Sequence, residues 1–375
     1  MNIPFKTPPF GYFPRPAFTE VVRAHLSLPE NIALFAPRRR GKTTWVLLEL
    51  QEAAAAWRMG FIYINLWKRR TDPIGVLVEG LEDAAGIKVA PDRELYGEIA
   101  AGIFTAGGKI KYPPVTSAET TRLSNAMTVI AKARPKTLLV IDEFQAISEA
   151  DPGQAATSAL RTSLEHHGDQ ILAMLTGSER TALTALFKRQ QAALLGQARM
   201  LELPDLGKEF IANRVEGFRL STHRVLDNDA LAAAYERLGQ SPMLLNDALG
   251  MMTVHRDLPL EEAVQTTIDT KGTEDFRVAL AGIAALDRAL LRRIAAGEAV
   301  YSDLDGLLAR GAEKTPTRAL VQKALGRLQK GALIEQKESG QGWVLADPML
   351  KEALRRGSPH HHTGIDGDRD GVGCE

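Results

Sequence analysis

The sequence predicts an α/β fold in which helices cover both faces of a parallel sheet, followed by two smaller domains. Four short apolar runs alternate with helical segments between residues 31 and 175, which is typical of parallel strands buried on both faces. From about Leu203 the strand-like runs stop and helical periodicity takes over. Between residues 285 and 346, three helical segments precede two short extended ones, which is the order of a winged helix-turn-helix.

Length and composition set the limits of this prediction. A chain of 375 residues is too long for one ordinary core and is expected to form two or three domains. With 45% apolar and 25% charged residues it has the composition of a globular protein, which excludes global disorder. Lysine plus arginine equals aspartate plus glutamate at 46 each, so any attraction to nucleic acid has to come from a local basic patch.

Cysteine usage and apolar runs indicate the compartment. Cys374 is the only cysteine, so neither an internal disulfide nor a cysteine-based zinc cage can form. The first residues lack the apolar core of an export signal, and no stretch approaches the roughly 18 uncharged apolar residues of a membrane span. We therefore expect a cytoplasmic protein with no membrane partner.

The predicted strands and the helices between them form the first domain, residues 31–202. It follows an entry segment, residues 1–30, that is rich in proline and aromatic residues and has a helical pattern at residues 18–26. We expect strands at residues 31–35, 61–66, 137–141 and 170–175, and helices at residues 44–56 and 72–85.

The loop between the first strand and the first helix has the pattern of a phosphate-binding (Walker A) loop. It consists of Ala36, Pro37, Arg38, Arg39, Arg40, Gly41, Lys42 and Thr43. Backbone N–H groups of such a loop bind phosphate anions, and Gly41 lets the main chain approach without a Cβ in the way. Lys42 would neutralise the β and γ phosphates of a nucleotide, and the Thr43 hydroxyl would bind Mg²⁺, which prefers oxygen ligands. The alternative is a basic helix start that is merely solvated.

Two acids follow the third strand directly. This strand delivers Asp142 and Glu143 to the carboxyl edge of the sheet, where ligands bind in open parallel sheets. Asp142 would bind magnesium through water or Thr43, and Glu143 would orient and deprotonate the attacking water. The alternative is a solvated turn, in which case the spacing from Lys42 is a coincidence.

Polar residues also follow the fourth strand. Thr176 or Ser178 would sense the γ-phosphate if this strand lies beside the third. Arg180 would reach the nucleotide of a neighbouring subunit as an arginine finger, which adds self-association to the predicted interactions. The alternative for Arg180 is an ordinary exposed arginine after a turn.

Two helical domains are expected after the sheet. The predicted lid, residues 203–275, has helices at residues 208–218, 230–238 and 244–252. The predicted winged-helix domain, residues 276–356, has helices at residues 285–296 and 315–330, a further segment at residues 303–310, and extended pieces at residues 332–337 and 342–346 joined by a hairpin turn at residues 339–342.

The helix at residues 315–330 is the candidate recognition helix. Thr315 would cap it; Leu320, Ala324 and Leu328 would face inward; and Arg318, Gln322, Lys323 and Arg327 would face outward. Ten basic and five acidic residues lie between Arg310 and Arg356, an excess suited to the phosphates of double-stranded DNA. The alternative is a winged helix that docks a protein.

The last residues, 357–375, form an acidic tail of a different kind. Asp366, Asp368 and Asp370 alternate as in the first half of a calcium-binding loop, but Glu375 comes too early for the twelfth position of an EF-hand. The tail is either a Ca²⁺ site formed by these four acids or a disordered segment.

With these motifs in place, residues 10–350 resemble the archaeal-type ATPases within the AAA+ and STAND NTPases. The matching segments are FPRPAF at residues 13–18, APRRRGKTT at residues 36–44, IDEFQ at residues 141–145, TGS at residues 176–178 and GQSP at residues 239–242. The resemblance implies a P-loop NTPase core with a helical lid and a winged helix. It also implies that ATP and Mg²⁺ are bound, that Arg15 lies near the adenine, that Thr44 belongs to the phosphate loop and that Pro242 belongs to the lid motif.

One residue departs from the family pattern, and the tail resembles a second motif. Ala36 replaces the first glycine of the usual loop pattern, which restricts the dihedral angles at the loop entry. The tail is similar to the core of the excalibur calcium-binding motif, which is usually extracellular and uses a second cysteine that this chain lacks.

Two functions are consistent with the sequence. The first is an ATP-hydrolysing switch whose winged helix contacts DNA. The second is a nucleotide-dependent scaffold that turns over little ATP and uses its last domain to hold a protein.

Overall fold

The computed structural model describes residues 10–87, 112, 114–133, 136–188, 190–273, 276, 280, 282–331, 333–337 and 342–356. The chain divides into two compact units, Met1–Thr267 and Ile268–Glu375. The finer division into five parts stays a prediction. No helix in the described ranges is both long and apolar enough to cross a membrane.

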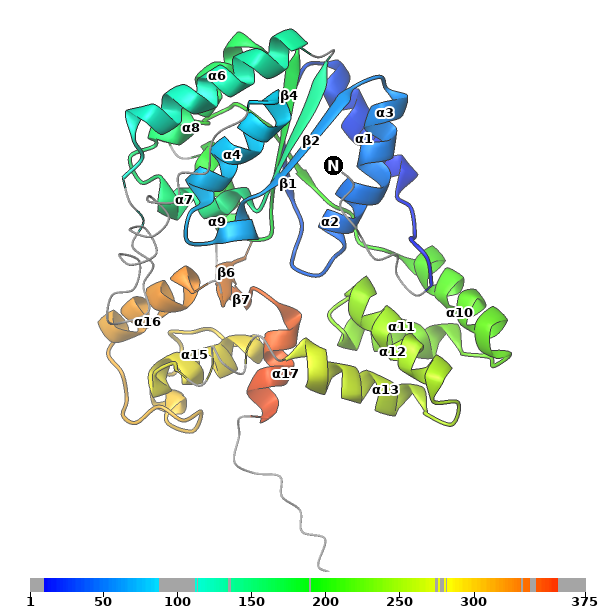
Figure 1. The fold of residues 1–375 in the computed structure, drawn as a ribbon. Coiled ribbons are helices and arrows are strands. Elements are labelled where there is room, and N and C mark those ends of the chain that lie inside the picture. The colour runs from blue at the N-terminus through cyan, green and yellow to red at the C-terminus, as the bar shows by residue number, and fades with distance from the viewer. Residues whose placement is uncertain are drawn as a thin grey trace, which may run out of the picture. The chain divides into compact units, whose positions relative to one another are not determined.

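The first unit contains a sheet of five parallel strands in the order β2-β3-β4-β1-β5 (Figure 1). These are β1 (Ile32–Phe35), β2 (Gly60–Asn65), β3 (Thr137–Asp142), β4 (Ile171–Gly177) and β5 (Arg199–Glu202). The register pairs Asn65 with Asp142 and Phe35 with Gly177, so the carboxyl ends of four strands lie level. The predicted parallel sheet is confirmed, and so is the position of the fourth strand beside the third.

Helices cover both faces of this sheet. Ala33 and Phe35 belong to one apolar core, whereas Ile32 and Leu34, which alternate with them, belong to another. The first core is covered by α4 (Pro73–Ala85), α6 (Ser117–Ala133), α7 (Ile147–Ala150), α8 (Ala155–His166) and α9 (Arg180–Lys188). The second is covered by α1 (Pro16–Ser27) and a continuous helical run of α2 (Lys42–Trp45), the π-helical η1 (Val46–Leu50) and α3 (Gln51–Ala56) (Figure 1).

The fifth strand was missing from the sequence prediction. β5 pairs in parallel with β1, from Arg199 opposite Ile32 to Glu202 opposite Phe35. Arg199 and Glu202 are exposed and the two residues between them are partly buried, because β5 lies at the edge of the sheet. A strand so short and polar carries no apolar run, which is why the pattern of buried strands did not include it.

Four helices complete the first unit after the sheet: α10 (Lys208–Thr222), α11 (Asn228–Arg237), α12 (Pro242–Val254) and α13 (Leu260–Thr267). The Asp227 side chain caps α11, and the Ser241 side chain caps α12, whose first turn holds Pro242. The helical region predicted after the sheet is therefore confirmed.

The second unit contains η4 (Ile268–Gly272), α15 (Ala285–Ala295), η5 (Asp305–Leu307), α16 (Arg318–Lys330) and α17 (Pro348–Arg356). An antiparallel hairpin of β6 (Ile334–Gln336) and β7 (Trp343–Leu345) follows α16. The order of helices and hairpin agrees with the predicted one, except that α17 was not expected and residues 338–341 of the turn lie outside the described residues. A winged helix stays a prediction.

Two details of the predicted recognition helix were wrong. Thr317, rather than Thr315, caps α16, because its side chain accepts a hydrogen bond from the backbone N–H of Leu320. Leu320 is 42% exposed rather than facing inward. Val321, Ala324, Leu325 and Leu328 form the buried stripe instead, at the spacing of one helix face.

Candidate nucleotide site

The loop after β1 closes into a turn that can surround an anion. The backbone N–H of Ala36 donates to the Gly177 carbonyl at the end of β4, over 3.1 Å, and the Ala36 side chain is fully buried. Arg39 and Gly41 both adopt left-handed backbone conformations, with φ of 66° and 85°. Gly41 takes this conformation without steric cost and leads directly into α2 at Lys42. The loop therefore closes despite the alanine at its first position.

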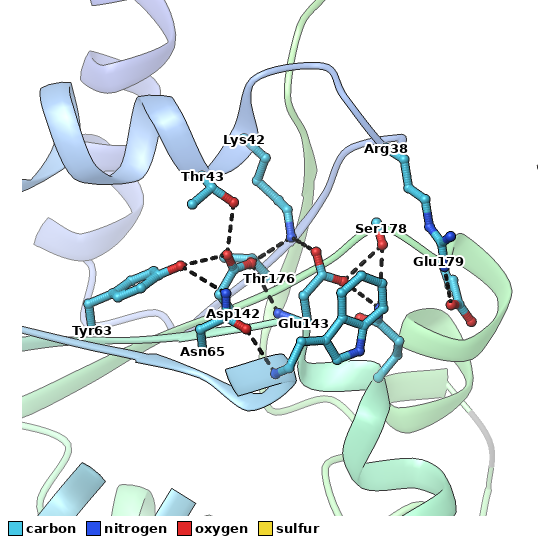
Figure 2. A network of polar contacts seen from close by, with 12 residues as sticks. Arg38, Lys42, Thr43, Tyr63, Asn65, Asp142, Glu143, Thr176, Ser178 and Glu179 are labelled. Atoms are coloured by element: carbon cyan, nitrogen blue, oxygen red, sulfur yellow. Dashed lines mark hydrogen bonds and ion pairs between the residues drawn. The ribbon is translucent and has the colours of Figure 1, made fainter. Parts of the chain in front are cut away.

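Lys42 reaches across the edge of the sheet to the two acids after β3 (Figure 2). Its Nζ lies 2.6 Å from Asp142 Oδ1, 3.0 Å from Glu143 Oε1 and 3.2 Å from Thr176 Oγ1. Only 6% of the Lys42 side chain is exposed. An ammonium buried to this extent requires charge partners, and the structure supplies two carboxylates.

Asp142 is fully buried and accepts hydrogen bonds on both carboxylate oxygens. Thr43 Oγ1 and the Tyr63 hydroxyl each donate to Oδ2 over 2.9 Å. Thr176 donates to Oδ1, as does the backbone N–H of Glu143 over 3.0 Å. Burial raises the pKa of Asp142, but the Lys42 ammonium and the donated hydrogen bonds outweigh it, so the pKa lies below its ordinary value.

Glu143 turns toward the same point from a left-handed backbone conformation, with φ of 57°. Its Oε1 faces Lys42, and its Oε2 accepts hydrogen bonds from Ser178 Oγ over 2.8 Å and from Gln145 Nε2 over 2.6 Å (Figure 2). Ser178 therefore contacts the glutamate, and Thr176 contacts the lysine and the aspartate. Thr176, near the end of β4, and Ser178, directly after it, both contact residues of the predicted cluster.

The arginines of the loop point in different directions. Arg38 forms an ion pair with Glu179 over 3.1 Å, and its guanidinium lies 5.2 Å from the centroid of the Trp67 ring. Arg40 forms an ion pair with Asp205 over 2.6 Å and donates to the Gln240 side chain. Arg40 thus joins the loop to the helical region. Pro242 begins α12 two residues after Gln240.

Arg180 is held by its own chain. Its guanidinium forms an ion pair with Glu202 over 2.5 Å and lies 4.2 Å from the centroid of the Phe35 ring. Arg180 therefore contacts residues of β1 and β5 in its own chain. Its role as an arginine finger stays a prediction. Thr44 lies in α2, one residue beyond the threonine that contacts Asp142.

The entry segment is attached behind the loop. Arg15 Nη2 donates to the Arg40 carbonyl over 3.0 Å, and burial lowers the pKa of Arg15. Glu49 in η1 accepts hydrogen bonds from the Tyr12 hydroxyl, the Arg15 N–H and Thr19 Oγ1. This places Arg15 against the loop, and its position near an adenine stays a prediction.

Arg214 in α10 attaches the same segment to the helical region. Its two terminal nitrogens donate to the carbonyls of Phe10 and Gly11, over 2.9 and 3.0 Å. Burial lowers the pKa of Arg214 to about 10. The entry segment therefore contacts both the phosphate loop and the helices after the sheet.

Three functional contacts were missing from the sequence prediction. Tyr63 reaches Asp142 because β2 pairs in register with β3, and Gln240 reaches Arg40 across the chain. Gln145 contacts Glu143 by turning back within η3 (Phe144–Ala146). Gln145 and Gln240 had a sequence signal, because they lie inside the IDEFQ and GQSP segments that were singled out as a whole, whereas Tyr63 had none.

The donor groups fit a magnesium nucleotide. Thr43 Oγ1 and Asp142 Oδ2 are 2.9 Å apart and are both oxygen atoms, which is the ligand type that Mg²⁺ prefers. Lys42 lies beside them at the first turn of α2, where backbone N–H groups favour anions. Asp366, Asp368, Asp370 and Glu375 lie outside the described residues, so the predicted Ca²⁺ site stays a prediction.

Comparison with known proteins gives one family match. The Excalibur calcium-binding domain matches residues 350–375, which agrees with the likeness of the tail noted in the sequence. No curated protein matches the chain by sequence.

Solved structures are similar over nearly the whole chain. A Walker-type ATPase of Pyrococcus abyssi is 18% identical with a TM-score of 0.63, and the similarity covers 94% of this chain and 99% of that chain. The ORC2 protein of Aeropyrum pernix in ADPNP–ADP complexes is 16% identical with a TM-score of 0.55, covering 94% and 96%. The ORC1 protein of Aeropyrum pernix in complex with DNA is 17% identical with a TM-score of 0.50, covering 92% and 93%. The fold is thus that of the Walker-type ATPases, as the resemblance implied.

Proposed function

We propose that this protein binds ATP with magnesium at the cluster of Lys42, Thr43, Asp142 and Glu143 and hydrolyses it. One observation carries the proposal: an ammonium and a hydroxyl from the helix after β1 meet two carboxylates from the end of β3 within 3.0 Å. The alternative of a solvated basic helix start does not account for a lysine that is only 6% exposed.

Binding requires Lys42 to change partners. Both carboxylates neutralise its ammonium in the structure, and the phosphates of a nucleotide are a competing anion at the same helix N-terminus. Glu143 Oε1 is released when the ammonium turns to the phosphates, which leaves that oxygen able to accept a proton from water. Magnesium bound by Thr43 and Asp142 would neutralise charge on the phosphates.

Tyr63 and Thr176 keep Asp142 in the required state. Burial and the nearby aspartate raise the pKa of Tyr63, so its phenol remains a hydrogen-bond donor to Asp142. The lowered pKa of Asp142 keeps the carboxylate ionised at neutral pH, which is the form that binds a divalent cation. The two side chains therefore prepare a charged acid in a buried place.

We further propose that ATP turnover is coupled to DNA through the second unit. Arg318 and Lys323 are exposed on α16, and the segment from Arg310 to Arg356 has ten basic residues against five acidic ones. Similarity to the structure of the ORC1 protein in complex with DNA favours this proposal. The competing function is a scaffold that docks a protein on the same helix and turns over little ATP.

The domain assignment that goes with this function has five parts. Residues 1–30 are the entry segment, 31–202 the ATPase domain, 203–275 the lid, 276–356 the winged-helix domain and 357–375 the tail. The Excalibur match supports calcium binding by the tail. The use of ATP favours a cytoplasmic protein, and self-association would allow Arg180 to act on a neighbouring subunit.

Phosphate release from Mg·ATP by the full chain tests the proposal. We expect turnover by the wild type that is lost in both Lys42→Ala and Glu143→Gln, and retained in Lys132→Ala, which removes an exposed lysine of α6. Adding duplex DNA should stimulate turnover, with a steep dependence on salt. Wild-type protein that binds ATP tightly but releases no phosphate would favour the scaffold instead.

A further inference from the structure

Gln145 lies next to the proposed base and is almost completely buried. It is 4% exposed in η3, the short helix that follows Glu143. Its Nε2 lies 2.6 Å from Glu143 Oε2 and 3.4 Å from Ser178 Oγ. A hydrogen bond from an amide to a carboxylate is among the stronger ones in proteins, because one partner is charged.

The oxygen of the same amide is not hydrogen-bonded within the described residues. Gln145 Oε1 is buried and has no hydrogen-bond partner in the described part of the chain. A buried acceptor without a partner destabilises the folded chain. A Cβ at Gly177 would lie 2.6 Å from this oxygen, so the absence of a side chain at the end of β4 is what makes room for the amide. Folding alone gives little reason for a glutamine here.

The contacts of Glu143 show what the amide can do. Lys42 faces Oε1, whereas Gln145 and Ser178 both donate to Oε2. When Lys42 turns to the phosphates of a nucleotide, Glu143 loses the contact on Oε1 and keeps the hydrogen bonds that Gln145 and Ser178 donate to Oε2. Glu143 also starts from a left-handed backbone conformation, which is strained for a non-glycine residue.

We propose that Gln145 is a positioning residue that fixes the orientation of the Glu143 carboxylate, so that Oε1 faces the attacking water once Lys42 has left it. The inference rests on the proposed ATPase function. Gln145 holds the base through one oxygen and leaves the other for proton transfer. Ser178 supports the same oxygen from the end of β4.

Steady-state ATP hydrolysis, ATP affinity and thermal unfolding of Gln145→Met in the full chain test this role. Methionine has a similar length and no hydrogen-bond donor. Because a misplaced catalytic group costs up to about 100-fold in rate, we expect kcat to fall by about 10- to 100-fold. We expect the Kd for ATP and the melting temperature of the nucleotide-free protein to stay close to those of the wild type. The matched control is Gln51→Met, the same change at an exposed position of α3, which should alter none of the three.

A double-mutant comparison separates this inference from the proposed function. In the Glu143→Gln background, Gln145→Met should have no further effect on residual turnover, because the group that it positions is gone. Ser178→Ala, which removes the second donor on Oε2, should lower kcat without weakening ATP binding, and it serves if Gln145→Met does not fold. If the wild type hydrolyses ATP and both Gln145→Met and Ser178→Ala have the same kcat as the wild type, the inference is overturned and the proposed function is not. Absence of wild-type turnover would overturn the proposed function and the inference with it.

Discussion

The first unit of this chain buries a cluster of charged side chains, whereas helix α16 of the second unit exposes its basic ones. In the first unit Lys42, Asp142 and Glu143 are buried together, and each has several partners. In the second unit Arg318 and Lys323 are exposed on α16. Burying three ionisable groups has a desolvation cost that folding rarely recovers, whereas exposed charges have almost none. The buried cluster therefore indicates a function far more strongly than the basic helix does.

Removing Lys42 should have the largest effect on ATP affinity and on stability. Lys42→Ala leaves two buried carboxylates without their cation, so we expect ATP affinity to fall by more than about 100-fold and stability to fall by about 3–5 kcal/mol. The matched change in the second unit is Lys323→Ala, which removes an exposed lysine of α16. An exposed charge of this kind should contribute about 0–1 kcal/mol. Denaturant unfolding that gives equal losses for both variants would contradict the contrast.

Exposed charges on α16 should matter for DNA rather than for stability. The double variant Arg318→Ala with Lys323→Ala is expected to weaken duplex binding and to reduce the slope of log affinity against log salt by about 2. The control is Arg23→Ala with Lys132→Ala, which removes one exposed arginine and one exposed lysine from the first unit. Unchanged DNA affinity in the α16 variant would favour protein docking by the second unit.

Acid should destabilise the first unit through Asp142. Its pKa in the folded chain lies below its ordinary value, so the unfolded chain binds more protons at low pH. The stabilisation is fully present above the unfolded pKa of about 3.9 and is lost as the pH falls through the lower, folded pKa. The free energy of unfolding of the wild type should therefore decrease more steeply than that of Asp142→Asn between pH 5 and the acid limit, as shown by denaturant titrations. Parallel curves would mean that the folded and unfolded pKa values are the same.

The smallest effect is expected from the tail. Removing residues 358–375 should leave ATP turnover within about twofold of the wild type, because the proposed site lies wholly within residues 36–178. Calcium binding measured by titration should be lost if Asp366, Asp368 and Asp370 bind the ion. An ATPase that requires calcium and fails without the tail would overturn this separation.

The fold and the centre of the site could be predicted because they depend on local patterns. Gly41, Lys42 and Thr43 follow a strand and open a helix, and Asp142 and Glu143 end an apolar run, so parallel pairing alone brings them to one edge. The side chains that donate hydrogen bonds to the two acids could not be predicted, because their contacts depend on strand register and side-chain direction. Tyr63 reaches Asp142 only because of how β2 aligns with β3, and no pattern along the chain contains that alignment.

Other parts of the sequence prediction were wrong or missing for equally specific reasons. β5 is an edge strand with no apolar run, so no buried-strand signal marked it. The start of α16 was misplaced by two residues because Thr315 and Thr317 are both possible caps, and Leu320 was assigned to the buried stripe in place of its neighbour Val321. The partner of Arg180 is Glu202 of β5, so missing that strand also hid the ion pair.

The identity of the nucleotide held by Glu143→Gln tests the central claim most directly. After incubation with Mg·ATP and rapid removal of free nucleotide, the account predicts intact ATP on the variant, ADP on the wild type and no nucleotide on Lys42→Ala. These results follow because Lys42 binds the phosphates, whereas Glu143 is needed only to activate water. Recovery of ADP from Glu143→Gln, or equal loss of nucleotide from both variants, would contradict the roles assigned to the cluster.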